Sequence, residues 1–360
     1  MKSKLLNFIS THKKWCEILS SPPYNVNIKR KDNLYLFKYT MDTDFGADDM
    51  LLECRGTIVE IIAGETPRIV CSAMPKFFNY NEVFAAKVDI SNSEVTQKID
   101  GTNIRFYFYK GEWHCATLGT IDASEAPLGA NSNFGELVEE VMGCGIQEFA
   151  YKASFAPDYT YIFELTSPKN QIVIPYENAL WGLCIINNIL SLEEPIYESK
   201  LWKLPKYYSF SSLEDCVKVV NELPDDEEGY VALDCGTGAR IKIKSPAYFA
   251  KHRLKGNGAN SVKYILSIME QDLLDDYLSI SPENAGKVHQ VMEKKNELLR
   301  AYDVEWRELV KQFAQFINSS DCNKGFAFAM LRGKVKNAEE WFNSIPLNKK
   351  VELLENEEKK

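Results

Sequence analysis

The sequence lacks the features that would place it outside ordinary globular proteins. No run of 18 apolar residues occurs in its 360 residues, which excludes a helix that spans a membrane. The basic start of the chain is followed by no apolar segment of the length that a signal peptide needs. With 19 glycines and 14 prolines, the chain is too poor in both to be collagen-like or of low complexity. We therefore expect a cytoplasmic, globular protein, and the length suggests two domains.

Paired cysteines and histidine clusters are also absent. The nine cysteines are an odd number, they are scattered, and no two are spaced as Cys-x-x-Cys. This pattern favours neither a disulfide framework nor a zinc site. Only four histidines occur, so histidine-based nucleophilic catalysis has little support. His114 fits a place on a strand better than a catalytic role.

Positive charge is in deficit. The chain has 42 basic and 51 acidic side chains, which gives a net charge of −9 with neutral histidine. An acidic protein is not expected to bind polyanions through its surface as a whole. If this protein acts on nucleic acid, it must do so through a local basic site, so the placement of individual lysines becomes the question.

The chain changes its pattern near residue 250. Before that point, short β-type segments separated by turn residues lie at 57–62, 104–109, 161–165, 171–175, 179–186, 230–234 and 240–244. Helical patterns there are clearest at residues 133–142 and 212–222. After residue 258 the strand patterns stop, and Ser281-Pro282 begins a long amphipathic helix. We predict an α+β fold with mainly antiparallel sheets in residues 1–252 and a helical domain in residues 253–360.

Three lysines stand out by their position on predicted strands. Lys98 directly follows the β-type segment 94–97 and precedes the turn Asp100-Gly101, although a lysine before such a turn is commonplace on surfaces. Lys242 and Lys244 alternate with isoleucines. This alternation places both ammonium groups on one face of a strand, about 7 Å apart and suited to phosphate oxygens. An exposed edge strand protected by lysine is the competing interpretation.

Two acidic residues and two further cations occupy comparable positions. Glu164 lies inside an apolar segment, where a carboxylate is costly unless it is paired or bound. Glu228 opens the segment Glu228-Gly229-Tyr230-Val231, although it also ends an acidic loop. Arg55 enters a strand, and Lys76 precedes two phenylalanines, where its stem could simply extend over a core.

The order of these motifs is more specific than any one of them. Arg-Gly, Lys-Phe-Phe-Asn, Lys-x-Asp-Gly, Phe-Glu, Glu-Gly-Tyr-Val and Lys-Ile-Lys-Ser follow one another over residues 55–245. The series resembles the covalent nucleotidyltransferase superfamily of ligases and capping enzymes. The phrases at residues 52–56, 74–79 and 168–176 resemble, more narrowly, the phage-type ATP-dependent RNA ligase 1 family. The resemblance covers residues 40–250 and implies an antiparallel-sheet nucleotidyltransferase (ATP-grasp-like ligase) domain, followed by an all-helical C-terminal domain.

The resemblance implies a reaction in three steps. Lys98 would attack the α-phosphate of ATP, forming a covalent lysyl-AMP and releasing pyrophosphate. AMP would then pass to the 5′-phosphate of an RNA end, and a 3′-hydroxyl would attack that end, forming the phosphodiester and releasing AMP. Since a lysine's reference pKa of about 10.4 leaves little of it neutral at pH 7, nearby cations or a bound Mg²⁺ or Mn²⁺ must favour the neutral form.

The resemblance also implies a role for each matching residue. The ATP site would comprise Arg55 and Lys76 for phosphate or the RNA end, Gly101 for room, Glu164 for the ribose, Val231 for adenine, and Lys242 and Lys244 for the α-phosphate. A metal ion would be held by Glu228 through water, and by Asp272, whose match to the family is loose.

One departure from the family pattern and several alternatives remain. Members often carry a basic residue before Gly-Ser or Gly-Thr, where this chain has Leu118-Gly119-Thr120, so one expected phosphate contact is missing.

A DNA ligase or capping guanylyltransferase usually adds an OB-fold, which would give several short strands after the last lysine motif. A non-catalytic nucleotide- or RNA-binding protein is the alternative of another class. As an RNA ligase, the protein is expected to be a monomer whose helical domain recognises broken tRNA anticodon loops.

Overall fold

The computed structural model describes residues 3–128, 132–248, 262–270, 284–319 and 324–331, with a few single residues between and after these ranges. The chain divides into two compact units, Met1–Ala285 and Gly286–Lys360. The predicted domain boundary at residue 252 lies outside the described ranges and stays a prediction. No helix among the described residues has the length and apolar character needed to cross a membrane.

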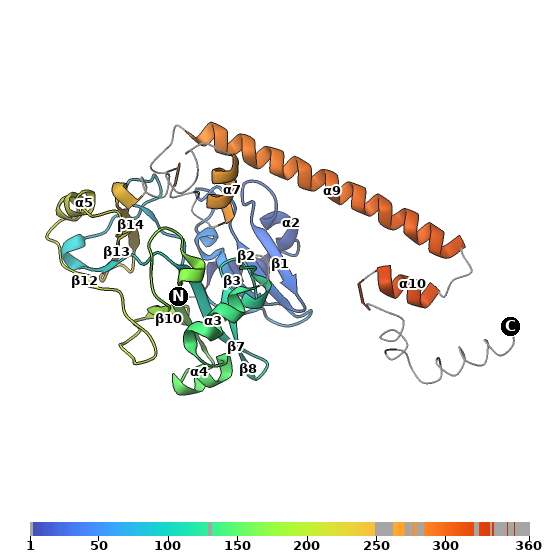
Figure 1. The fold of residues 1–360 in the computed structure, drawn as a ribbon, viewed down its shortest axis with the longest axis horizontal. Coiled ribbons are helices and arrows are strands. Elements are labelled where there is room, and N and C mark those ends of the chain that lie inside the picture. The colour runs from blue at the N-terminus through green and yellow to red at the C-terminus, as the bar shows by residue number, and fades with distance from the viewer. Residues whose placement is uncertain are drawn as a thin grey trace. The chain divides into compact units, whose positions relative to one another are not determined.

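The first unit contains three sheets (Figure 1). The first contains, in spatial order, β1 (Asn27–Lys31), β2 (Leu34–Lys38), β3 (Arg55–Glu60) and β4 (Arg68–Cys71). The second contains β11 (Leu192–Glu194), β10 (Ala179–Asn187), β9 (Tyr159–Thr166), β7 (Thr102–Tyr109) and β8 (Glu112–Thr117). The third contains β12 (Tyr207–Tyr208), β6 (Ser93–Gln97), β13 (Gly229–Asp234), β14 (Arg240–Lys244) and β5 (Phe78–Asn79). All the pairs are antiparallel except β14 with β5.

Helices accompany the sheets and make up the described part of the second unit. The first unit contains α1 (Lys4–Thr11), α2 (Trp15–Leu19), α3 (Phe134–Met142), α4 (Ile146–Lys152), α5 (Leu213–Asn221) and α7 (Val262–Glu270). The second unit contains α10 (Lys324–Leu331) and nearly all of α9 (Ala285–Ser319). The predicted α+β fold, with antiparallel sheets and a helical C-terminal region, is therefore confirmed.

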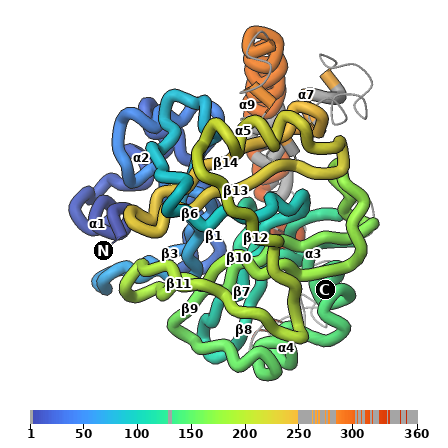
Figure 2. The backbone as a smooth tube through the Cα atoms, turned by 90° about the vertical axis from the view of Figure 1, so that its left-hand side faces the viewer, coloured from blue at the N-terminus to red at the C-terminus, as the bar shows by residue number. Residues whose placement is uncertain are grey.

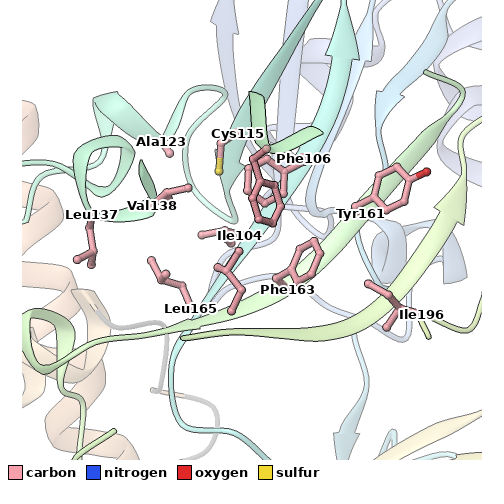
Figure 3. Packing of buried hydrophobic residues seen from close by; sticks show 12 residues of the cluster. Ile104, Phe106, Cys115, Ala123, Leu137, Val138, Tyr161, Phe163, Leu165 and Ile196 are labelled. Atoms are coloured by element: carbon pink, nitrogen blue, oxygen red, sulfur yellow. The ribbon is translucent and has the colours of Figure 1, made fainter. Parts of the chain in front are cut away.

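The second sheet packs a different set of side chains on each of its faces. Ile104 and Phe106 of β7 form an apolar cluster with Leu137 and Val138 of α3 (Figure 3). Phe149 of α4 belongs to the same cluster, with its ring centroid 5.6 Å from that of Phe106. Tyr107, the neighbour of Phe106 in β7, points the other way and packs against Leu34 and other residues of the first sheet. This alternation follows from the two-residue period of a strand. The second sheet is thus fixed between helices and the first sheet.

The third sheet has one apolar face and one face with lysines. Ile241 and Ile243 of β14 pack with Cys216 and Val220 of α5, which lies beside this sheet (Figure 2). Lys242 and Lys244 alternate with the isoleucines and therefore point to the opposite face. The alternation predicted from the sequence holds in the structure, and it leaves the two lysines on the side away from α5.

The β-type segment at residues 171–175 does not form a strand, so this prediction was wrong. Its apolar residues are buried as expected, since Val173 and Ile174 pack on Tyr248. Their backbone N–H groups, however, donate to one carboxylate oxygen, Oδ2 of Asp100, at 2.9 Å each. A side chain that is distant in sequence thus replaces the neighbouring strand as the hydrogen-bond partner.

Arg105 joins the first and second sheets. It is fully buried in β7. Its Nη1 donates to the carbonyl oxygen of Gly56 at 2.6 Å, and its Nη2 donates to that of Thr117 at 2.5 Å. The carbonyl of Ser72 accepts a longer bond of 3.4 Å. One guanidinium therefore satisfies carbonyl groups at the ends of β3 and β8, and both ends border the site described below.

We expect Arg105→Ala to lower the free energy of unfolding by about 3 kcal/mol or more, because it leaves buried carbonyl groups without donors. Urea denaturation followed by tryptophan fluorescence measures the loss. The matched control is Arg30→Ala, which removes an exposed arginine of β1. A loss for Arg105→Ala no larger than that of the control would show that the buried guanidinium does not hold the sheets together.

Candidate active site

A cavity of about 1150 Å³ lies where the three sheets meet. Residues from every sheet line it, including Arg55 of β3, Glu164 of β9 and Val231 of β13. Of the predicted site residues that the structure describes, all but Lys244 contribute to the lining: Arg55, Lys76, Lys98, Gly101, Glu164, Glu228, Val231 and Lys242. Asp272 lies outside the described residues. Residues spread over nearly 190 positions of the sequence thus converge on one cavity.

Lys98 lies at the end of β6, where the strand enters the cavity. Its backbone N–H donates to the carbonyl oxygen of Gly229 at 2.8 Å, which continues the pairing between β6 and β13. Its side chain is 20% exposed, and its Nζ donates to Oε2 of Glu228 at 2.9 Å. The ammonium group is therefore held in place by a carboxylate while it still faces the cavity.

Glu228 is held between two lysines. Its side chain is 1% exposed, and its Oε1 is 2.7 Å from Nζ of Lys244, whose side chain is 2% exposed. A buried carboxylate is costly unless it is paired, and two ammonium groups pair with this one, while Oε1 accepts no hydrogen bond from the described residues. This group of three side chains thus carries two positive charges and one negative charge.

The backbone at Gly229 allows this arrangement. Gly229 has a φ of +129°, a region that L side chains rarely adopt. A Cβ at this position would also collide with the backbone carbonyl of Ile243. The glycine therefore lets β13 approach β14 closely, directly beside Glu228 and Lys244.

Asp100 has a structural role that the sequence did not predict. Besides the two backbone N–H groups of residues 173 and 174, it accepts the hydroxyl of Tyr248 on Oδ1 at 2.8 Å. Burial raises the pKa of the Asp100 carboxyl and Glu228 adds to that effect, while the hydrogen bonds oppose it. The aspartate of the Lys-x-Asp-Gly motif thus fixes the loop that carries Lys98 to two distant segments.

Gly101 has a packing role as well. A Cβ at Gly101 would collide with the backbone carbonyl oxygen of Leu165 in β9 and would lie 3.0 Å from Cγ of Glu164. Only glycine fits at this position, because the loop that carries Lys98 approaches β9 closely. The room that it would leave for a nucleotide remains a prediction.

Glu164 is poised to titrate near neutral pH. It lies in β9, opposite Asn103 on one neighbouring strand and Trp181 on the other. Burial raises the pKa of Glu164 to about 7, with Glu228 adding to the rise, while Lys98 and Arg55 act in the opposite direction. The sequence predicted a carboxylate that needed a partner, and the structure places charged groups of both signs around it.

Three cations surround the ring of Phe77 at the cavity. The guanidinium carbon of Arg55 lies 5.3 Å from the ring centroid, and that of Arg240 and Nζ of Lys242 lie 5.7 Å away. Arg240 also forms a bidentate ion pair with Glu193. Nη1 of Arg55 is buried without a hydrogen-bond partner among the described residues. The aromatic face helps to hold these positive charges close together.

Lys76 lies within a group of aromatic rings. It is 6% exposed, and its Nζ lies 4.7 Å from the ring centroid of Tyr39, 5.3 Å from that of Phe78 and 5.8 Å from that of Phe45. It also donates to the hydroxyl of Tyr39 at 3.2 Å. The motif Lys-Phe-Phe-Asn therefore supplies rings to two separate cation groups, one at Phe77 and one at Phe78.

Two other residues discussed from the sequence have plain structural surroundings. His114 of β8 stacks on Tyr107 with ring centroids 5.3 Å apart and does not line the cavity. Leu118 does line the cavity, in the turn after β8, where it offers no charge. Among the described residues, no group of three or more His, Cys, Asp or Glu side chains is arranged to hold a metal ion.

The eight cysteines that the structure describes are free.

Comparisons of the sequence with known proteins find RNA ligases. The sequence profile of the phage RNA ligase 1 family, described as RNA ligase, matches residues 53–255. A protein of Autographa californica nuclear polyhedrosis virus, named as a bifunctional polynucleotide kinase/RNA ligase, is 29% identical over 269 residues. That match covers 69% of this chain but only 37% of the viral protein. An RNA ligase of Rhodothermus phage RM378 is 23% identical over 84% of this chain and 83% of its own.

Solved structures that align with this chain include an archaeal ATP-dependent RNA ligase. It aligns with a TM-score of 0.45 and 12% identity, over 80% of this chain and 78% of its own.

We expect Glu164→Gln to change the pH dependence of stability. The pKa of Glu164 is raised from its ordinary value of 4.5 to about 7 in the folded protein, so the folded state binds the Glu164 proton more tightly than the unfolded state does. The stability that this proton contributes is fully present below about pH 4.5 and is lost as the pH rises through about 7. The melting temperature of the variant, relative to wild type, should therefore rise by roughly 3 °C between about pH 5 and about pH 8. Thermal unfolding monitored by circular dichroism measures this difference, with the exposed Glu148→Gln as control. A difference that does not vary with pH would contradict the assigned environment of Glu164.

Proposed function

Because the chain belongs to the phage RNA ligase 1 family, we propose that it is an ATP-dependent RNA ligase that joins a 5′-phosphate end to a 3′-hydroxyl end. The observation that carries the proposal is the position of Lys98, whose ammonium group faces a large cavity beside a buried carboxylate shared with Lys244. A lysine nucleophile needs such a setting, since charged neighbours can control its protonation.

In the first step, Nζ of Lys98 attacks the α-phosphorus of ATP. A bond forms between this nitrogen and phosphorus, the bond to the pyrophosphate oxygen breaks, and the Lys98 proton is lost to solvent. Nζ of Lys98 donates a hydrogen bond to Glu228, so this contact must be given up before the nitrogen can attack the phosphorus. Lys244 pairs with the other oxygen of the same carboxylate, so Glu228 would keep one cationic partner when Lys98 is released.

Glu228 also suits a divalent cation. Mg²⁺ and Mn²⁺ prefer carboxylate and phosphate oxygens, and Mg²⁺ commonly uses one or two carboxylates together with substrate phosphates and water. Glu228 would help to hold the ion through a water molecule, and the ion would neutralise phosphate charge and disfavour the protonated form of Lys98. A role for Asp272 remains a prediction from the sequence.

The other lining residues would bind ATP according to their chemistry. Val231 and Lys242 are directly opposite each other on β13 and β14, so adenine on the valine would lie near the lysine that receives the α-phosphate. Glu164 would accept hydrogen bonds from the ribose hydroxyls when it is ionised. Arg55, with its buried Nη1, and Lys76 would contact the remaining phosphates or the RNA end.

The second and third steps use the same cavity. The 5′-phosphate of RNA attacks lysyl-AMP, a pyrophosphate linkage forms, and the bond between Lys98 and phosphorus breaks. A 3′-hydroxyl then attacks the activated 5′-phosphate, forming the phosphodiester and releasing AMP. We assign the choice of RNA, including broken tRNA anticodon loops, to residues 253–360 and expect the protein to act as a monomer.

The part of the chain described after Lys244 favours an RNA ligase over the alternatives within the superfamily. It contains helices α7, α9 and α10 and none of the strands that an OB-fold would add. The alternative that the protein binds nucleotide or RNA without catalysis is tested by its reaction with ATP.

Incubation with α-labelled ATP and Mg²⁺, followed by denaturing electrophoresis, tests the proposal. We expect label on wild-type protein and on the exposed control Lys152→Ala, and none on Lys98→Ala. Pyrophosphate treatment beforehand removes any AMP that the purified protein already carries. If pyrophosphate-treated wild type takes no label, the catalytic proposal fails and a binding protein is the better account.

Lys244→Met should slow the formation of lysyl-AMP about 100-fold or more, because it removes a buried charge that both stabilises the reacting phosphate and pairs with Glu228. Rapid-quench measurement at saturating ATP gives this rate directly. Lys244→Arg, which keeps the charge, should recover part of it. A rate for Lys244→Met within about threefold of wild type would remove Lys244 from the mechanism.

A further inference from the structure

Two lysines of the first sheet extend toward the cavity from strands that were not predicted from the sequence. In the pairing of β1 with β2, Lys29 is opposite Leu36, and Asn27 is opposite Lys38. Cross-strand partners and residues two apart share a face, so Lys29, Leu36 and Lys38 point to the same side. Leu36 packs there against the second sheet. The two lysines are therefore directed toward that sheet, and both line the cavity.

Both lysines converge on one turn of the second sheet. Nζ of Lys29 donates to the carbonyl oxygen of Gly119 at 2.7 Å. A Cβ added to Gly119 would lie 3.9 Å from Nζ of Lys38. The turn begins at the last residue of β8 and consists of residues 117–120, all of which line the cavity. Leu118 adds no charge to this wall, so β1 and β2 supply its cations.

The turn is held rigidly. Thr117 Oγ1 accepts the backbone N–H of Gly119 at 3.2 Å and that of Thr120 at 3.1 Å. The carbonyl of Thr117 is bonded to the buried guanidinium of Arg105. A wall fixed in this way does not need to be ordered when a ligand binds, which lowers the entropic cost of binding.

The charge of Lys29 is not cancelled by its contact in the structure. Lys31, two residues further along β1, is 2.7 Å from Oε1 of Glu125 and 3.6 Å from Oδ2 of Asp122. The contact of Lys29 is instead a neutral carbonyl group. Glu125 and Asp122 are thus paired with Lys31, which does not line the cavity.

We propose that Lys29 and Lys38, together with the turn at residues 117–120, form a phosphate-binding subsite at the wall of the cavity. Two ammonium groups at a rigid turn suit the oxygens of one tetrahedral phosphate group. The phosphate belongs either to the nucleotide, beyond its α-phosphate, or to the 5′ end of RNA. Only this choice of source depends on the proposed function, while binding of a phosphate group does not.

The test compares three double variants of the full chain by calorimetric titration. Lys29→Ala/Lys38→Ala removes both charges, and Lys29→Arg/Lys38→Arg keeps them. Lys14→Ala/Lys152→Ala removes the same charge at exposed positions that do not line the cavity. One arm titrates inorganic pyrophosphate, and the other compares a 5′-phosphorylated RNA with the same RNA bearing a 5′-hydroxyl.

In the alanine variant, we expect either the Kd for pyrophosphate to rise about tenfold or more, or the preference for the 5′-phosphate to fall by a similar factor. The first result assigns the subsite to the nucleotide and the second to the RNA end. The arginine variant should stay within about threefold of wild type in both arms.

An alanine variant within about twofold of the control in both arms would overturn the subsite, as would an arginine variant that binds as weakly as the alanine variant, or a wild type that binds neither probe. A wild type that takes no label from ATP, yet binds pyrophosphate through these lysines, would refute the proposed ligase activity and leave the subsite standing.

Discussion

The carboxylate of Glu228, held between Lys98 and Lys244, is the interaction on which the site depends. It joins the end of β6, the start of β13 and the end of β14 through one nearly buried group. A carboxylate in this position needs both cations, and each lysine in turn is fixed by it. The same arrangement explains why a glycine follows Glu228, because only a residue without a side chain allows β13 to approach β14 so closely. The residues that hold the three strands together here, Lys98, Glu228 and Lys244, are therefore also the residues to which the reaction is assigned.

Two other buried side chains bring the rest of the cavity to this group. Asp100 ties the loop of Lys98 to residues 173 and 174 and to Tyr248. Arg105 ties the ends of β3 and β8 together, which places Arg55 on one side of the cavity and the turn at Gly119 on another. Each acts through bonds to backbone or hydroxyl groups. The positions of the charged lining residues thus follow from the way in which the three sheets are joined.

The sequence predicted what depends on local pattern and missed what depends on distant contacts. The alternation at residues 240–244 was enough to place Lys242 and Lys244 on the face opposite Ile241 and Ile243. The segment 171–175 was mistaken for a strand because its apolar run has a strand's composition, while its true partner is a carboxylate more than 70 residues away. Arg105 was not singled out from the sequence, because its partners are backbone carbonyl groups that could not be identified without the fold. Strands β1 and β2 were not predicted, and Lys29 and Lys38 were missed with them.

Mass spectrometry of the protein after reaction with ATP and Mg²⁺ tests the central claim most directly. Proteolysis and fragmentation of the peptides locate the modified residue without any substitution that could disturb the fold. The account predicts the mass of one AMP on Lys98 alone, and its loss when pyrophosphate or 5′-phosphorylated RNA is added. AMP on another lysine of the cavity, such as Lys76 or Lys242, or a modified Lys98 that neither reagent can discharge, would contradict it.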